Sequence, residues 1–132
     1  MTKFTTEQEL DLIKQLDELE VPTRQLFGVR FGKRWRPRKR RRREIRTAAL
    51  EAARAYDNSC RKHKVYPTAY GMQQYIQDHM YCRGYHPEKL KGQEEDRLPG
   101  EPGSMILVYY ISQVIIIVVR LWLEYRRKNN LS

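Results

Sequence analysis

The hydrophobic positions nearest the N-terminus recur at helical spacing between about Thr6 and Glu20. Thr6 is followed three residues later by Glu9, which is the pattern of a capping box, and Val21-Pro22 ends the segment. The other positions of this predicted helix are rich in acid, which is usual for a solvated surface. A sharper hypothesis is that the acidic helix folds back on basic residues further along the chain and competes with their ligand. Its apolar stripe consists of Leu12, Ile13, Leu16 and Leu19.

Between Arg24 and Pro37 the hydrophobic residues no longer recur at helical spacing, and glycines separate the aromatic residues. Two glycines within five residues make a helix costly, and partial alternation of apolar residues with arginine predicts a short strand or an extended arm. Interleaved arginine and aromatic residues suit a groove in which phosphates meet guanidinium groups and exposed bases stack on the rings. We expect Phe27 and Phe31 to pack in the core and Trp35 to contact a ligand.

A second helix is predicted from about Arg38 to Asn58, because alanine, the strongest helix former, dominates its second half. Six consecutive basic residues, Arg38 to Arg43, occupy its first turns. The N-terminal end of a helix is partially positive, which disfavours cations there. These cations also repel one another unless phosphates or lipid head groups neutralise them. We predict that this turn is frayed alone and ordered on binding. The apolar stripe of the helix consists of Ile45, Ala49, Ala52 and Tyr56.

Both cysteines and all three histidines lie between Cys60 and His86. Cys60 with His63, and His79 with Cys82, form two pairs that are each separated by two residues, which is the ligand set of a tetrahedral Zn site. The alternative is surface histidines with small buried cysteines, because CxxH followed by HxxC is an uncommon ligand order. A helix from Ala69 to Cys82, capped by Thr68 and closed by Gly84, also makes this stretch a candidate helix-turn-helix.

The most apolar stretch of the chain is Met105 to Tyr125, in which only Arg120 and Glu124 are charged. Its length matches the roughly 20 residues that cross a bilayer as a helix. The polar residues of this predicted helix share one face, which forms a polar stripe. That face would contact a partner helix in the membrane, line a pore, or face water if the helix belongs to a soluble bundle. The stripe consists of Tyr109, Gln113, Arg120, Glu124 and Arg127.

The pattern as a whole predicts a mainly α-helical protein. Residues 1–90 form a small basic helical domain, and residues 91–104, rich in proline, glycine and acid, form a flexible linker. Residues 105–128 form a long apolar helix that either spans a membrane or serves as a core or oligomer helix. A homo-oligomer through Met105 to Tyr125 is one of these alternatives.

The charge of the chain is concentrated in one segment, Arg30–Arg46, which we call the basic segment. It carries a local charge of +10, equal to the net charge of the whole chain. Such a segment predicts a polyanionic partner, which is RNA, DNA or anionic lipid. The run is similar to arginine-rich RNA-binding motifs and equally to localisation signals. The candidate binding residues are Arg30, Lys33, Arg34, Trp35, Arg36, Arg38, Lys39, Arg40, Arg41, Arg42, Arg43 and Arg46.

The chain contains no Gly-rich phosphate loop, nucleophile elbow or paired-carboxylate motif, so we expect a protein that is not an enzyme. No secretory signal is recognisable, and we expect residence on the cytoplasmic side. The leading hypothesis is a nucleic-acid-binding protein tethered to a membrane by its C-terminal helix, a layout that suits a viral or phage structural or packaging accessory. The alternatives are a soluble nucleic-acid-binding regulator whose apolar helix is core or dimer interface, and a small oligomeric membrane protein that binds anionic lipid.

Overall fold

The structure is a computed structural model that describes residues 5–22, 34–90 and 103–129. Helices dominate it, and the long apolar helix is present at the C-terminal end, so the predicted mainly α-helical fold class is confirmed. Most of the predicted linker lies outside the described residues, as do Phe27 and Phe31. The helices are α1 (Thr6–Glu18), α3 (Lys39–Lys62), α4 (Ala69–Met80), α5 (Pro87–Leu90) and α6 (Gly103–Lys128), with a π-helical turn η1 (Tyr81–Tyr85) before α5. Two short strands, β1 (Val21–Pro22) and β2 (Arg34–Trp35), pair antiparallel.

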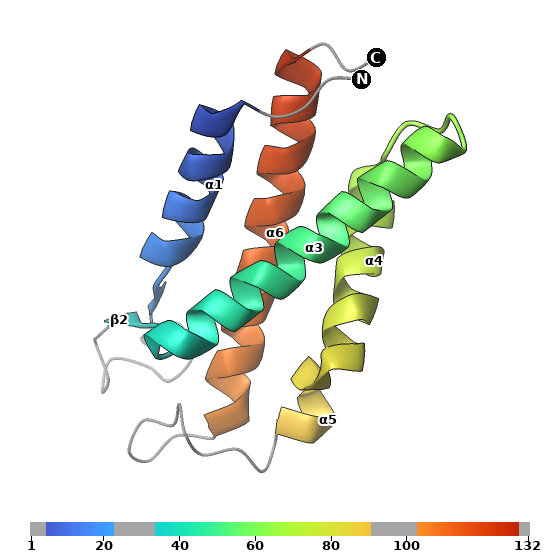
Figure 1. Cartoon of the computed structure of the whole chain (residues 1–132). Coiled ribbons are helices and arrows are strands. Elements are labelled where there is room, and N and C mark those ends of the chain that lie inside the picture. Colours follow the sequence, from blue (N-terminus) through green and yellow to red (C-terminus); the bar gives the residue numbers. More distant parts are fainter. Residues whose placement is uncertain (1–4, 23–33, 91–102, 130–132) are drawn as a thin grey trace.

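Helix α6 lies at the centre of the bundle and contacts α1, α3, α4 and α5. In Figure 1, α3 crosses α6 diagonally, with α1 on one side and α4 on the other. The start of α1 is joined to the end of α6 by paired side-chain amides. Gln8 Nε2 donates to Asn129 Oδ1 at 3.1 Å, and Asn129 Nδ2 donates to Gln8 Oε1 at 2.7 Å. The apolar C-terminal helix therefore shares one core with the helices that precede it.

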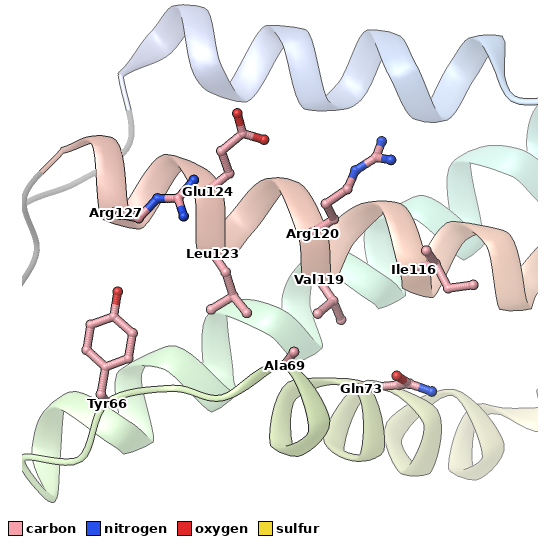
Figure 2. Close-up of a pocket in the computed structure, with 9 residues that line it drawn as sticks. All are labelled: Tyr66, Ala69, Gln73, Ile116, Val119, Arg120, Leu123, Glu124 and Arg127. Carbon is pink, nitrogen blue, oxygen red and sulfur yellow. The ribbon is translucent and has the colours of Figure 1, made fainter.

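Helix α6 is long and apolar enough to cross a membrane, since an 18-residue window within Ile106–Lys128 has a mean hydropathy of 2.1. In the structure, however, 56% of its apolar window is buried among the other helices. The predicted polar stripe lies mainly on the side of α6 that α3 does not cover. Figure 2 shows Arg120 and Glu124 projecting from that side, between α1 and α4. Arg120 and Arg127 are exposed, and Gln113 and Glu124 are half-buried, so the stripe lies at the surface of the bundle.

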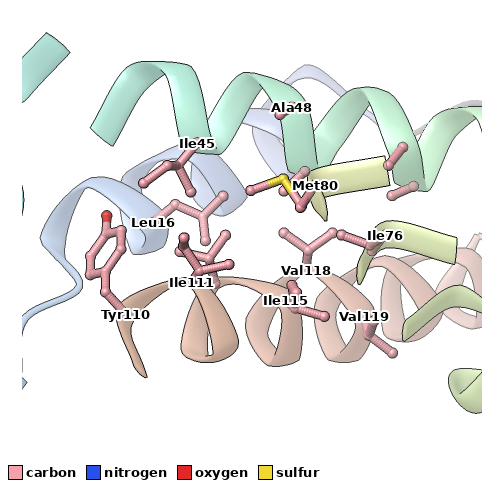
Figure 3. Packing of buried hydrophobic residues seen from close by; sticks show 14 of the residues in the cluster. Leu16, Ile45, Ala48, Ile76, Met80, Tyr110, Ile111, Ile115, Val118 and Val119 are labelled. Carbon is pink, nitrogen blue, oxygen red and sulfur yellow. The ribbon is translucent and has the colours of Figure 1, made fainter. Parts of the chain in front are cut away.

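The core is built where an alanine-rich face of α3 meets α4 and α6. The predicted stripe of α3 is confirmed, since Ile45, Ala49 and Ala52 are 0% exposed and Tyr56 packs partly buried against the core. Ala48 and Ala53, at most 1% exposed, widen this face. Small side chains allow neighbouring helices to approach closely, and larger residues of α4 and α6 fill the space between the axes. Figure 3 shows this packing, with Leu16 from α1 meeting Ile45 from α3 and Ile111 from α6. The same cluster continues through Met72, Ile76 and Met80 of α4 and Val114, Val118 and Leu121 of α6.

The helix boundaries follow local capping signals. Thr68 caps α4 as predicted, because its Oγ1 accepts from the N–H of Gly71 at 3.0 Å, and Gly84 has a φ of 100°, which favours glycine. The capping box of α1 is one residue earlier than predicted. It joins Thr5 to Gln8, with Gln8 N donating to Thr5 Oγ1 at 3.1 Å and Thr5 N donating to Gln8 Oε1 at 3.0 Å.

Candidate nucleic-acid interface

The described part of the basic segment, residues 34–46, forms β2 and the first turns of α3. Arg38 occupies the N-cap position with an extended backbone, and its side chain makes no capping hydrogen bond. No acidic residue lies in the first turn of α3. Most helices offset the partial positive charge of their first N–H groups with a capping oxygen or a carboxylate. The first turn of α3 instead adds side-chain cations to that partial charge, which makes it a strongly electropositive end.

The cations of the basic segment separate into exposed and anchored groups. Lys39 and Arg43 are exposed and one helical turn apart, and they form no ion pair with the part of the chain that the structure describes. Arg40 forms an i, i+4 pair with Glu44 at 3.2 Å, but its side chain is 92% exposed, and such pairs contribute at most about 1 kcal/mol. Lys39, Arg40 and Arg43 are available to an external anion. The exposed positions also include Arg34, Arg36 and Arg38, of which Arg36 donates to the carbonyl oxygen of Asp17.

Other arginines of the basic segment hold the fold together. Arg42 is half-buried, and its Nη1 donates to the carbonyl oxygen of Pro37 at 2.8 Å. Arg46 Nη1 lies 2.6 Å from Asp17 Oδ1, with only 20% of its side chain exposed. Arg41 is also half-buried. The sequence predicted one continuous binding run, whereas the structure divides the run by helical phase into residues that face water and residues that face the fold.

The acidic helix does lie against the basic segment, through Asp17 near the end of α1. Its carboxylate pairs with Arg46, and its carbonyl oxygen accepts from Arg36 Nη1 at 3.1 Å. The predicted contact between the acidic helix and the basic segment is therefore present. Competition between this contact and a ligand stays a prediction.

Trp35 occupies a core position, which corrects the expectation that its ring contacts a ligand. It is 8% exposed and packs edge-on against Tyr110 of α6, with 6.1 Å between the ring centroids. The alternation in β2 points Arg34 to water and Trp35 inward. Arg30 and Lys33 lie outside the described residues.

The two Cys/His pairs lie at opposite ends of α4. Cys60 and His63 end α3, just before α4 begins, whereas His79 and Cys82 lie where α4 passes into η1. The rise along the axis of α4 from Ala69 to His79, ten residues on, is about 15 Å. The ligands of one Zn ion, by contrast, all lie within roughly 2.3 Å of it. Within residues 5–22, 34–90 and 103–129 no group of three or more His, Cys, Asp or Glu is arranged to hold a metal. His86 caps α5 instead, because its Nδ1 accepts from Glu88 N at 3.1 Å.

A buried polar cluster was missed from the sequence. Asp57 of α3 is 3% exposed, and its carboxylate accepts from Arg126 Nη1 at 2.6 Å, from Trp122 Nε1 at 3.2 Å and from Arg61 Nη2 at 3.3 Å. The guanidinium of Arg126 lies 5.1 Å from the ring centre of Tyr66, within the range of a cation–π contact. We call this group the Asp57 cluster. Its donors form hydrogen bonds with the buried carboxylate of Asp57. Its role is structural, because it joins the end of α6 to α3.

Comparison of the chain with models of known protein families, with curated proteins and with solved structures finds no match. The functional proposal therefore depends on the chemistry of the residues themselves.

Proposed function

We propose that this protein is a non-enzymatic nucleic-acid-binding protein that holds the phosphate backbone with the exposed cations of its basic segment. The observation that carries the proposal is the first turn of α3, where exposed cations lie around a helix N-terminus with no side-chain cap and no acid. Backbone N–H groups at such an end bind phosphate directly, and the neighbouring cations add charge-assisted hydrogen bonds. A nucleic acid supplies a regular series of phosphates, which suits a series of cations better than one small anion does.

The position of Trp35 supports contact with the backbone over stacking on bases. Its ring is buried against Tyr110, and no other aromatic residue occurs in the described part of the basic segment. Recognition that depends on phosphate contacts positions a protein on nucleic acid without reading its sequence. We therefore propose binding with little sequence preference and with a strong dependence on salt.

The buried position of α6 supports the soluble form of this hypothesis. For α6 to span a bilayer, it would have to leave α1, α3 and α4, whose apolar faces would then lose their main partner. Withdrawal would also separate Trp122 and Arg126 from the carboxylate of Asp57. Breaking a buried ion pair is strongly unfavourable, because it leaves an uncompensated charge.

A membrane tether is the second candidate, favoured by the length and mean hydropathy of α6. Alkaline extraction of membranes from cells that make the full chain separates the two candidates. We expect release of the chain into the soluble fraction. Retention in the membrane pellet would overturn the soluble form and favour the tether.

The nucleic-acid proposal is tested by the salt dependence of binding to a DNA duplex and an RNA duplex of equal length. The double variant Lys39→Ala/Arg43→Ala removes two exposed cations from the first turns of α3. We expect the slope of log K against log salt to fall by about two units, because each lost phosphate contact removes about 0.9.

The matched control is Arg54→Ala/Lys62→Ala, which removes the same charge from exposed positions further along α3. We expect this control to leave the slope nearly unchanged. Equal slopes for the two double variants would contradict the proposal, since binding would then follow net charge and not the site.

A further inference from the structure

A cleft lies beside the first turns of α3, between that helix and the π-helical turn η1. Its volume is about 400 Å³. Arg43 and Thr47 line it from α3, and Arg83 and Tyr85 line it from η1. Because Arg43 is one of the exposed cations of the basic segment, the cleft continues the candidate interface from α3 onto a second element. We call it the α3–η1 cleft.

The turn in η1 places Arg83 against α3. Gly84 has a φ of 100°, a conformation that residues with a side chain rarely adopt, so the chain turns directly after Arg83. Arg83 Nη2 lies 2.7 Å from Glu51 Oε2, and the two side chains are 47% and 46% exposed. An exposed pair of this kind exchanges at little cost. A guanidinium has five N–H donors, so Arg83 keeps donors for a second acceptor while it contacts Glu51.

Thr47 marks the centre of the cleft on α3. Arg43, Thr47 and Glu51 follow one another at four-residue spacing, so they share one face of the helix. Thr47 therefore lies about 6 Å along the axis from Arg43, and about 6 Å from Glu51 on the other side. The side chain of Thr47 is exposed, and its hydroxyl can donate a hydrogen bond. An anion above Thr47 would lie between the guanidinium groups of Arg43 and Arg83.

The charges around the cleft leave one positive charge in excess. Arg40 pairs with Glu44 at 3.2 Å, and Arg83 pairs with Glu51. Arg43 forms no ion pair within residues 5–22, 34–90 and 103–129. A phosphodiester of a nucleic-acid strand carries one negative charge, whereas a terminal phosphate carries nearly two. The excess charge therefore matches one phosphodiester.

We propose that the α3–η1 cleft is a phosphate clamp, in which Arg43 and Arg83 hold one phosphodiester of the nucleic acid and the Thr47 hydroxyl donates to it. The clamp rests on the proposed function, and it adds Arg83, which lies outside the basic segment, to the interface. Contacts between arginine and phosphate are charge-assisted and roughly twice as strong as neutral hydrogen bonds. Because the two arginines come from different elements, the clamp also orients the strand relative to α3.

The test of the clamp is the affinity for a DNA duplex, measured over a series of salt concentrations. We expect Arg83→Ala to weaken binding about tenfold and to lower the salt slope by about one unit. Arg43→Ala/Arg83→Ala should weaken binding by less than the product of the two single effects, because both side chains hold the same phosphate. The matched control is Arg54→Ala, which removes the same charge from an exposed position of α3 and should change the affinity little.

Glu51 distinguishes a phosphate contact from a structural role of Arg83. Glu51→Gln removes the competing charge and keeps an acceptor for Arg83, so we expect binding to tighten about twofold or more. Arg83→Ala weakens binding, and the two variants should therefore change the affinity in opposite directions. If Arg83 acted only by pairing with Glu51, both variants would weaken binding, and that result would overturn the clamp.

Thr47 tests the centre of the clamp. Thr47→Glu places a carboxylate where the phosphate would lie, so we expect binding to weaken about tenfold or more. Ser59→Glu adds the same charge at an exposed position near the other end of α3 and should have little effect. Circular dichroism checks that each variant stays folded, which is expected because the substituted side chains are accessible to water. Equal losses for the two glutamate variants would contradict the clamp.

The outcomes separate the clamp from the proposed function. An unchanged salt slope for Arg83→Ala, with a lowered slope for Lys39→Ala/Arg43→Ala, would overturn the clamp and leave nucleic-acid binding by the basic segment in place. Unchanged slopes for both would overturn the proposed function as well. Independent effects of Arg43→Ala and Arg83→Ala would show that they hold no common phosphate. An Arg83→Ala variant that keeps its duplex affinity but loses flotation with anionic phospholipid vesicles would assign the cleft to a lipid surface instead.

Discussion

The two ends of α3 use arginine in opposite ways. At the N-terminal end, Arg40 and Arg43 extend into water around a helix start that lacks a cap. At the C-terminal end, Asp57 is enclosed, and Arg61 and Arg126 close on its carboxylate. The first end has several cations and no acidic residue in its first turn, whereas the second holds two guanidinium groups on one buried carboxylate. Burial and the presence of one carboxylate decide which role the same side chain performs.

The largest expected effect is at the C-terminal end of α3, where the carboxylate is buried. Asp57→Ala leaves the buried guanidinium of Arg126 without its carboxylate, so we expect a loss of about 3–5 kcal/mol in the free energy of unfolding. Urea denaturation followed by circular dichroism measures it. Asp57→Leu combined with Arg126→Met removes both charges and should cost less than Asp57→Ala alone. An Asp57→Ala variant as stable as the parent would show that the buried pair contributes nothing.

The second prediction concerns Trp35, which lies in the basic segment but belongs to the core. Trp35→Ala removes a buried ring from its contact with Tyr110, and we expect a loss of about 3 kcal/mol. At a temperature where the variant is fully folded, the salt slope of nucleic-acid binding should be unchanged. A lower salt slope for Trp35→Ala, with an unchanged free energy of unfolding, would indicate that Trp35 contacts the ligand.

A third prediction separates the anchored from the exposed cations of the basic segment. Arg46→Ala breaks the contact with Asp17 and should lower stability by about 1 kcal/mol, with little change in the salt slope. Arg43→Ala should change the salt slope by about one unit and leave stability within about 0.5 kcal/mol. Urea titration and duplex binding on the same samples measure both quantities. The comparison between anchored and exposed cations fails if the two variants behave alike.

The smallest expected effect is a dependence of stability on pH at the alkaline end. Burial raises the pKa of Tyr110 to about 12, and burial together with its hydrogen bond to Asp11 raises the pKa of Tyr125 to about 12, from an ordinary value of 10.0. The folded protein therefore holds two protons that the unfolded chain releases near pH 10. Stability is unaffected below that pH and falls as the pH rises through 12.

Tyr125→Phe sharpens this prediction, because it removes one of the two groups. Urea midpoints measured below and within this pH range should fall less steeply for the variant than for the parent. Identical pH profiles would show that Tyr125 does not hold its proton in the folded state.

The helices could be predicted because their signals are local. Periodic leucines and alanines, the Thr68 cap and the Gly84 stop each act within one or two turns. The position of α6 is not a local property, since the length and apolarity that suit a membrane also suit a buried helix. What places α6 in the core is the alanine face of α3 together with the larger side chains of α4, and those residues are distant in sequence.

The basic segment could be located from the sequence, but which of its side chains face water could not. Charge density identifies the basic segment, but only the phase of α3 shows that Arg43 faces water and Arg46 faces Asp17. For Trp35, alternation predicts two sides of a strand and does not say which side meets the core. Asp57 left a usable signal, because it follows Ala53 by four residues on the apolar stripe, and a charged residue there implies a buried partner.

The central position of α6 has a consequence for synthesis, because α6 is the last helix of this segment to emerge from the ribosome. Before α6 emerges, the apolar faces of α1, α3 and α4 lack their main packing partner, while the basic segment is already outside the exit tunnel. The core forms only when residues far apart in the chain come into contact, so folding is slow. Aggregation-prone intermediates are therefore exposed for longer. The charges of the nascent chain are therefore accessible before its core exists, and chaperones that shield hydrophobic segments have their longest opportunity in that interval.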